Sequence, residues 1–153
     1  MAQYFYEEKN DIWVTTWNKL YNLSFLKEFH IHFLEHVYHE DIVMHAMLAL
    51  NTRSFSQTTY LYNCKREDSI TNMEQGYTLK HLNDLTIVFS EIRRLMQADN
   101  NLSKHLQKEI NLYYLFEIYH RYLPAMYSNI KRVDLIKGLA RLSQNCLPPI
   151  LET

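Results

Sequence analysis

Glycine and proline are scarce in this chain, which limits the folds open to it. Of 153 residues, two are glycine and three are proline. Tight β-hairpin turns and glycine-rich phosphate-binding loops depend on glycine, so both are disfavoured. Hydrophobic residues recur mainly at spacings of three and four, which is the period of an amphipathic helix. The sequence therefore predicts an all-α protein, a compact and irregular bundle of five to seven helices.

The length and composition fit one globular domain. Hydrophobic residues make up 47% of the chain and charged residues 22%, close to the average for globular proteins, and the length matches a single domain. We therefore treat 1–153 as one helical domain. Residues 51–77 are polar and rich in turn formers, so we expect an irregular insertion or loop there. We expect flexible termini at 1–10 and 147–153.

Capping residues and apolar periodicity divide the domain into helices. Asp11, Thr78 and Ser103 are good N-caps, and Pro124 disfavours helix at the residue before it, which predicts a break or kink. The predicted helices cover 11–22, 25–50, 79–98, 103–122, 125–132 and 134–144. The predicted inward-facing stripes are Leu26, Phe29, Phe33, Val37, Met44, Met47 and Leu48; Leu82, Leu85, Val88 or Phe89, Ile92, Leu95 and Met96; Leu102, Leu106, Ile110, Tyr113, Phe116 and Leu123; and Leu135, Leu139 and Leu142.

Net charge and targeting signals point to no special compartment. The formal net charge is −1, which gives no global attraction to nucleic acid or membrane. The first residues carry several charges and contain no apolar signal-peptide core, and no apolar run reaches the ~20 residues of a membrane span. We expect a soluble intracellular protein, cytoplasmic or nuclear, with no membrane partner. Frequent Asn, Ile and Tyr with little Gly are typical of AT-rich genomes, including many viral ones.

Five possible metal ligands follow one another at helical spacing between residues 28 and 39. They are Glu28, His32, Glu35, His36 and His39. On a continuous helix 25–50 the three histidines would lie within an arc of about 60°. Imidazoles at i and i+4 can bind one zinc or iron ion. The alternatives are histidines at the edge of the core without chemistry, which we favour, and a pH-responsive interface. We therefore expect no cofactor. The alternative is a metal-dependent helical-bundle protein that binds zinc or iron on the His/Glu face of helix 25–50.

A basic stretch with interleaved tyrosines lies near the C-terminus. Its cations are Arg121, Lys131, Arg132, Lys137 and Arg141. Clustered cations bind phosphates, and aromatic side chains stack on unpaired bases. This pattern gives the hypothesis of a nucleic-acid-binding regulator, against the simpler interpretation of a solvated basic face.

Aromatic residues are abundant, and the chain lacks the common motifs of catalysis and nucleotide binding. Aromatic residues make up 14% of the chain, including 12 tyrosines, and Tyr and Trp are enriched at the centres of protein interfaces. Walker, dinucleotide, nucleophile-elbow and zinc-finger patterns are missing from the sequence. The sequence favours a non-enzymatic interaction module of the adaptor, assembly or host-interaction type, which binds another protein or a second copy of itself. The predicted contact residues are Tyr4, Tyr6, Trp13 and Trp17.

Overall fold

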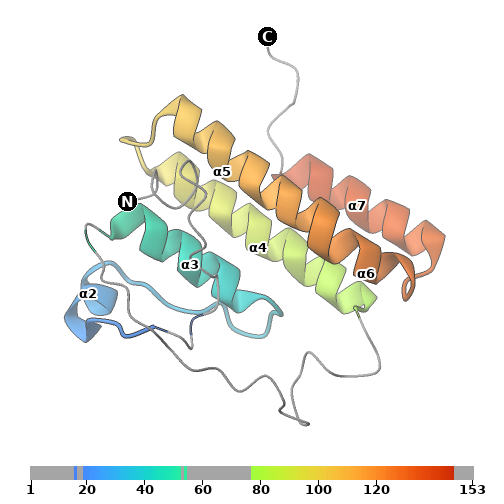
Figure 1. Ribbon diagram of the computed structural model, residues 1–153, viewed down its shortest axis with the longest axis horizontal. Helices are drawn as coiled ribbons and strands as arrows, with labels where there is room; N and C mark the ends of the chain where they lie inside the picture. Colours follow the sequence, from blue (N-terminus) through green and yellow to red (C-terminus); the bar gives the residue numbers. More distant parts are fainter. Residues whose placement is uncertain (1–15, 17–18, 53, 55–76, 147–153) are drawn as a thin grey trace.

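A computed structural model describes residues 16, 19–52, 54 and 77–146 (Figure 1). Their elements are α2 (Leu23–Glu28), α3 (Glu40–Asn51), α4 (Leu79–Ala98), α5 (Lys104–Glu117), the π-helix η2 (Ile118–Tyr122), α6 (Leu123–Tyr127) and α7 (Arg132–Cys146). These residues contain no strand, so the predicted all-α class is confirmed.

Helix α4 lies at the centre of the bundle. It packs against both α3 and α7, and Phe89 on α4 meets Tyr114 on α5 edge-on, with ring centroids 5.4 Å apart. Elements α5, η2 and α6 follow one another without a gap and form a single rod. This rod runs antiparallel to α4 and α7 (Figure 1).

Helix α3 is buried on every side. Eight successive residues, from Ile42 to Ala49, are buried. All of them except His45 are apolar, and a helix that is apolar all round has no solvent face. Phe25, Leu26, Phe29, Leu34 and Val37, which precede α3 in the chain, are half-buried against the same core.

Helix α4 agrees with the prediction at both ends. It spans Leu79–Ala98 after Thr78, the range and the cap that the sequence predicts. The predicted stripe is also confirmed, since Leu82, Leu85, Val88, Phe89, Ile92 and Met96 are buried and Leu95 packs against the core.

The continuous helix predicted over 25–50 is wrong. The chain leaves helix after Glu28 and re-enters it at Glu40. His30 adopts a left-handed backbone with φ 51°, and the Ile31 N–H donates to Leu26 O (2.9 Å) while the His30 N–H donates to Lys27 O (3.3 Å). These two bonds form a Schellman motif, which ends a helix. The motif ordinarily carries Gly or Asn at the left-handed position, so its histidine gives no stop signal in the sequence.

Of the break or kink predicted at Pro124, the break is wrong, because the chain stays helical through the proline. Before Pro124 the helix widens into η2, where the Leu123 N–H donates to Ile118 O. A wider turn accommodates a residue that has no N–H and whose ring would collide with the carbonyl four residues earlier. The predicted helix 125–132 is replaced by α6, which ends at Tyr127.

Helices α4 and α7 pack closely where Gly138 faces Leu82. A Cβ on Gly138 would lie 2.8 Å from Leu82 Cγ, so no side chain fits there while Leu82 keeps its place. Of the stripe predicted for α7, Leu135 and Leu142 are buried and Leu139 packs against the core.

Several predictions concern segments that the structure does not describe. Most of the insertion at 51–77 and the termini 1–10 and 147–153 lie outside the described residues, as does most of the predicted helix 11–22. Its described end, residues 19–22, is not helical. Within the described residues, no helix is both long and apolar enough to cross a membrane.

Candidate interaction surface and histidine junction

The predicted metal ligands do not share a helix face. Glu28 ends α2, and His32, Glu35, His36 and His39 lie in the irregular segment between α2 and α3. His32 turns back on its own segment, with its Nδ1 2.6 Å from His30 O. Among the described residues, no group of three or more His, Cys, Asp or Glu side chains could hold a metal ion. The structure therefore identifies none of these five residues as a metal ligand.

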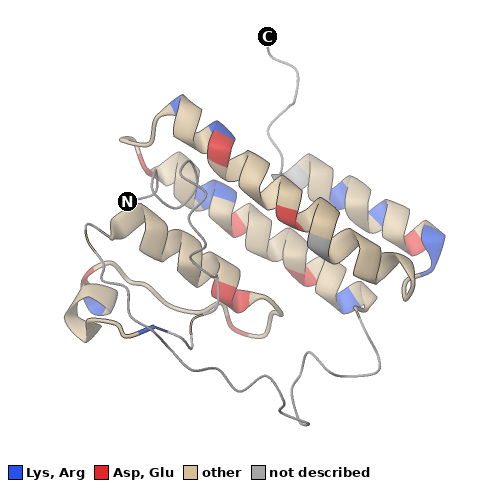
Figure 2. Ribbon diagram, in the orientation of Figure 1, with Lys and Arg blue, Asp and Glu red and all other residues tan. Residues whose placement is uncertain are grey.

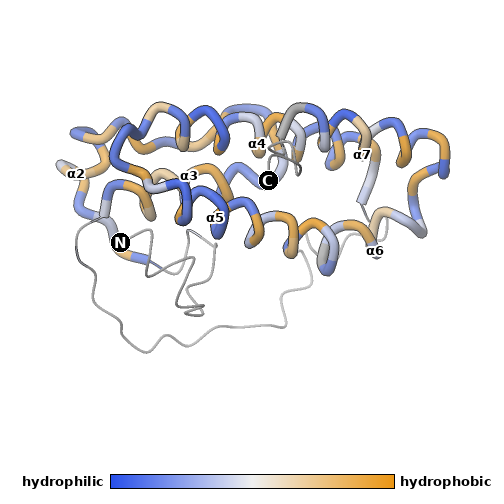
Figure 3. The backbone as a smooth tube through the Cα atoms, turned by 90° about the horizontal axis from the view of Figure 1, so that it is seen from above, coloured by the Kyte–Doolittle hydropathy of each residue, from blue (hydrophilic) through white to orange (hydrophobic). Residues whose placement is uncertain are grey.

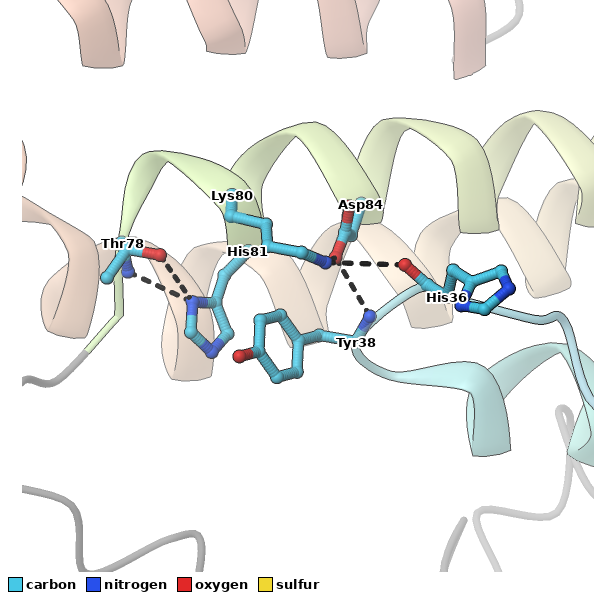
Figure 4. A network of polar contacts seen from close by, with 6 residues as sticks. All are labelled: His36, Tyr38, Thr78, Lys80, His81 and Asp84. Carbon is cyan, nitrogen blue, oxygen red and sulfur yellow. Dashed lines mark hydrogen bonds and ion pairs between the residues drawn. The ribbon is translucent and has the colours of Figure 1, made fainter.

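The structure instead joins the end of this segment to the start of α4. We call residues 36–39 together with Tyr77–Asp84 the histidine junction. Asp84 is 6% exposed and accepts a hydrogen bond from the Tyr38 N–H (2.9 Å). Its carboxylate also pairs with Lys80, which donates to His36 O (3.3 Å) (Figure 4). A carboxylate from α4 thus holds the backbone of the segment.

Aromatic rings close the junction on its buried side. Tyr38 stacks on His81 with ring centroids 4.1 Å apart. The His39 ring lies 4.8 Å from Tyr122 of η2, 5.7 Å from Tyr77 and 5.8 Å from His81. His39 has a left-handed backbone with φ 66° and forms the N-cap of α3, so the chain turns sharply to place this ring among the others.

His81 caps α4 with its side chain. Its Nδ1 accepts a hydrogen bond from the Thr78 N–H (3.0 Å) and lies 2.9 Å from Thr78 Oγ1 (Figure 4). This is the capping-box position, three residues after the cap, where Glu or Gln is usual. An Nδ1 that accepts the backbone N–H has no proton of its own, so the hydroxyl donates and the neutral imidazole carries its proton on Nε2.

Burial favours the neutral form of His39 and of His81. Burial and the nearby His81 together lower the pKa of His39 to about 4, against the opposing charge of Asp84. Burial also lowers the pKa of His81. The negative charge of Asp84 opposes this shift, and the positive charge of Lys80 adds to it.

The rod of α5, η2 and α6 carries apolar residues on two opposite sides. Its core side repeats every four residues, with Ile110, Tyr114, Ile118, Tyr122 and Met126 buried. Midway between them lie Leu112, Phe116, His120 and Pro124, all exposed. Two residues correspond to about 200° of helix rotation, so this second row faces away from the core. We call these four residues, with flanking Tyr119 and Tyr127, the outer ridge.

The outer ridge is mostly aromatic and well exposed. Phe116 is 58% exposed, Tyr119 66% and Tyr127 67%. The rings of Phe116 and His120 are 4.2 Å apart, and those of Tyr119 and His120 are 5.2 Å apart. Figure 3 shows hydrophobic residues recurring along α5, η2 and α6. The prediction that Phe116 faces the core is wrong, because the core-facing row passes through Tyr114 and Ile118 instead.

The predicted nucleic-acid residues lie mainly on and just before α7. Lys131 precedes the helix and Arg132 begins it, while Lys137 and Arg141 follow four residues apart; all four are exposed. Figure 2 shows basic residues recurring along α7. Arg121 belongs to η2 instead. Exposed Val133 and Ile136 lie among the α7 cations, so this face is mixed rather than purely basic.

The predicted contact residues Tyr4, Tyr6, Trp13 and Trp17 lie outside the described residues. The junction residues Tyr38, Tyr77, His81 and Asp84 were not predicted. One signal was present, since Thr78 and His81 have capping-box spacing and Lys80 and Asp84 have ion-pair spacing. The outer ridge also had a signal, a second apolar row between the positions of the core row.

Comparison with known proteins gives no relative to argue from. No protein-family model matches the chain, and neither a curated protein nor a solved structure is significantly similar to it.

Proposed function

We propose that this protein is a non-enzymatic interaction module that binds a protein partner along the outer ridge. The observation that carries the proposal is the second apolar row of the rod, which faces away from the core. A bundle helix needs one apolar stripe to fold. Leu112 and Phe116 on the opposite face, with Tyr119 and Tyr127 beside it, expose hydrophobic area that the fold does not use. Contiguous exposed apolar area is typical of interaction sites.

The chemistry of the ridge favours a protein over a nucleic acid. Tyrosine and phenylalanine are enriched at the centres of protein interfaces, where they offer apolar area with few rotatable bonds. His120 is the one ridge member that can carry a positive charge, whereas nucleic-acid binding depends on several cations. The partner that fits this ridge presents an apolar helix face, either from another protein or from a second copy of this chain.

The test compares two glutamate variants at exposed apolar positions. Phe116→Glu places a charge on the ridge, and Ile87→Glu is the matched control, because Ile87 is 51% exposed on α4. Circular dichroism should show both variants folded. Sedimentation velocity measures self-association, and quantitative affinity capture identifies other partners, each of which is then purified and measured by calorimetry.

We expect Phe116→Glu to weaken self-association or binding of the purified partner at least tenfold, as for a central interface residue. Ile87→Glu should leave it unchanged. If wild type and Phe116→Glu have the same oligomeric state and bind the same partners equally well, the proposal is wrong. The nucleic-acid hypothesis remains a separate prediction, which a steep salt dependence of oligonucleotide binding would support.

A further inference from the structure

We propose that the histidine junction is an acid-sensitive contact, in which protonation of His39 and His81 separates residues 36–39 from the first turns of α4. The junction joins the segment leading into α3 to the central helix. Its opening would therefore release residues 36–39 from α4 while α4 stays packed against α3 and α7. The proposal is independent of the outer ridge.

His81 cannot take up a proton at Nδ1 and keep its present contacts. Its Nδ1 accepts the Thr78 N–H, and a proton on that nitrogen would place two donors against each other. The same ring stacks on Tyr38, whose backbone N–H is held by Asp84. Protonation of one imidazole therefore disturbs both the cap of α4 and the stacked ring of the segment.

His39 is placed where a charge would be poorly solvated. Its Nε2 is buried and has no hydrogen-bond partner among the described residues. Aromatic rings from three places surround the imidazole, namely Tyr77, His81 and Tyr122. An imidazolium there would have no acceptor for its Nε2 proton among the described residues. It would also repel a protonated His81, whose ring centroid is 5.8 Å away. Exposure of the segment to water removes both penalties.

The surrounding charges do not reverse this argument. Asp84 of α4 favours protonation of both histidines, but its carboxylate already binds Lys80 and the Tyr38 N–H. Lys80, on the same helix, disfavours protonation of His81. Tyr122 of η2 and Tyr77 are neutral at acidic pH, and Glu40 and Asp41 follow His39 at the start of α3.

The size of the effect follows from proton linkage. The pKa of His39 is about 4 in the closed junction and returns toward the ordinary value of about 6.5 when the segment is open to water. The open state then binds the proton more readily, so acid shifts the equilibrium toward opening. Between pH 7.5 and pH 5 the opening equilibrium should rise by about 30-fold from His39 alone.

Hydrogen exchange measures this opening directly. The Tyr38 and Thr78 amides report on it, because each donates to a side chain across the junction or its cap. After correction for the intrinsic pH dependence of exchange, protection of peptides that cover 36–39 and 78–82 should fall by at least about 30-fold at pH 5, since His81 adds to the effect of His39. Peptides from the middle of α4 and from α7 should keep their protection.

Three variants separate the junction from general acid effects. His81→Gln restores the usual capping box without a titrating ring, and His39→Asn keeps a residue that tolerates the left-handed backbone. The double variant His39→Asn, His81→Gln should lose most of the acid response. His30→Asn is the matched control, since His30 is also left-handed but exposed, and it should respond like wild type.

The proposal is overturned if wild-type protection of the junction is the same at both pH values, or if the double variant responds like wild type. It is also overturned if α4 and α7 lose protection together with the junction, since global unfolding would then explain the response. If the double variant does not fold, His81→Gln alone should still reduce the response.

Discussion

Gly138 on α7 faces Leu82 on α4, and the space between them leaves no room for a Cβ. A Cβ at position 138 would lie 2.8 Å from Leu82 Cγ, and Leu82 is 1% exposed. A side chain that is fully buried among its neighbours has little room to move aside. The glycine is therefore kept for space, although it lies inside a helix where alanine is intrinsically favoured.

We predict that Gly138→Ala destabilises the protein by up to about 2 kcal/mol. Overpacking costs about 1–3 kcal/mol, and the ~1 kcal/mol that alanine gains in helix propensity offsets part of it. The free energy of unfolding from urea denaturation measures the change. Adding Leu82→Val should recover part of the loss, and a stabilised Gly138→Ala would contradict the prediction.

At the scale of elements, the chain between the end of α2 and the start of α3 depends on histidines in an unusual backbone conformation. His30, His36 and His39 all have left-handed backbones, a conformation that costs a non-glycine residue about 1–2 kcal/mol. These three positions replace the middle of the helix predicted over 25–50 by an irregular segment. The segment brings Tyr38 to Asp84, 46 residues further along the chain.

We predict that His30→Gly stabilises the protein by about 0.5–1 kcal/mol. Glycine adopts the left-handed position of the Schellman motif without strain, although it loses more conformational freedom on folding. Thermal and urea denaturation measure the gain. Lys27→Gly, inside the same helix, is the contrasting control and should cost about 1 kcal/mol. A loss of stability in His30→Gly would show that its side chain contributes more than its backbone costs.

The sequence predicts an element well when the residues that set its ends and its buried face are close together in the chain. Helix α4 has a standard cap and one strong apolar stripe, so its range and core residues were predictable. The helical path through Pro124 was not predicted, because a proline disfavours helix at the residue before it and the wider turn of η2 has no comparable sequence signal. The junction was not predictable as a unit, since Tyr38 meets His81 and Asp84 only after the chain folds. The outer ridge was visible as periodicity, but Phe116 fits either row until the core-facing side is known.

For the whole molecule, buried histidines make stability depend on pH. Burial lowers the pKa of His39 and of His45 to about 4, and the Lys19 charge contributes at His45. In the unfolded chain both return to about 6.5. Between these values the unfolded state binds more protons, so the free energy of unfolding falls as the pH drops from about 6.5 to about 4.

We predict a loss of up to about 3 kcal/mol per histidine over this range. Urea denaturation at a series of pH values from 7.5 to 4 measures it. The variant His39→Asn, His81→Gln should keep only the part that belongs to His45. A stability that stays constant down to pH 4 would show that neither histidine is held neutral by the fold.

The burial of α3 on all sides also has an evolutionary consequence. A helix with one solvent-exposed face tolerates substitution at the positions on that face. Its tolerance of substitutions therefore varies along the chain with the period of the helix. From Ile42 to Ala49 no residue is on the surface, so in a saturation mutagenesis library this stretch would appear as one unbroken block of intolerance. Neutral drift along α3 would then proceed through paired, volume-compensating exchanges with its neighbours rather than through single steps.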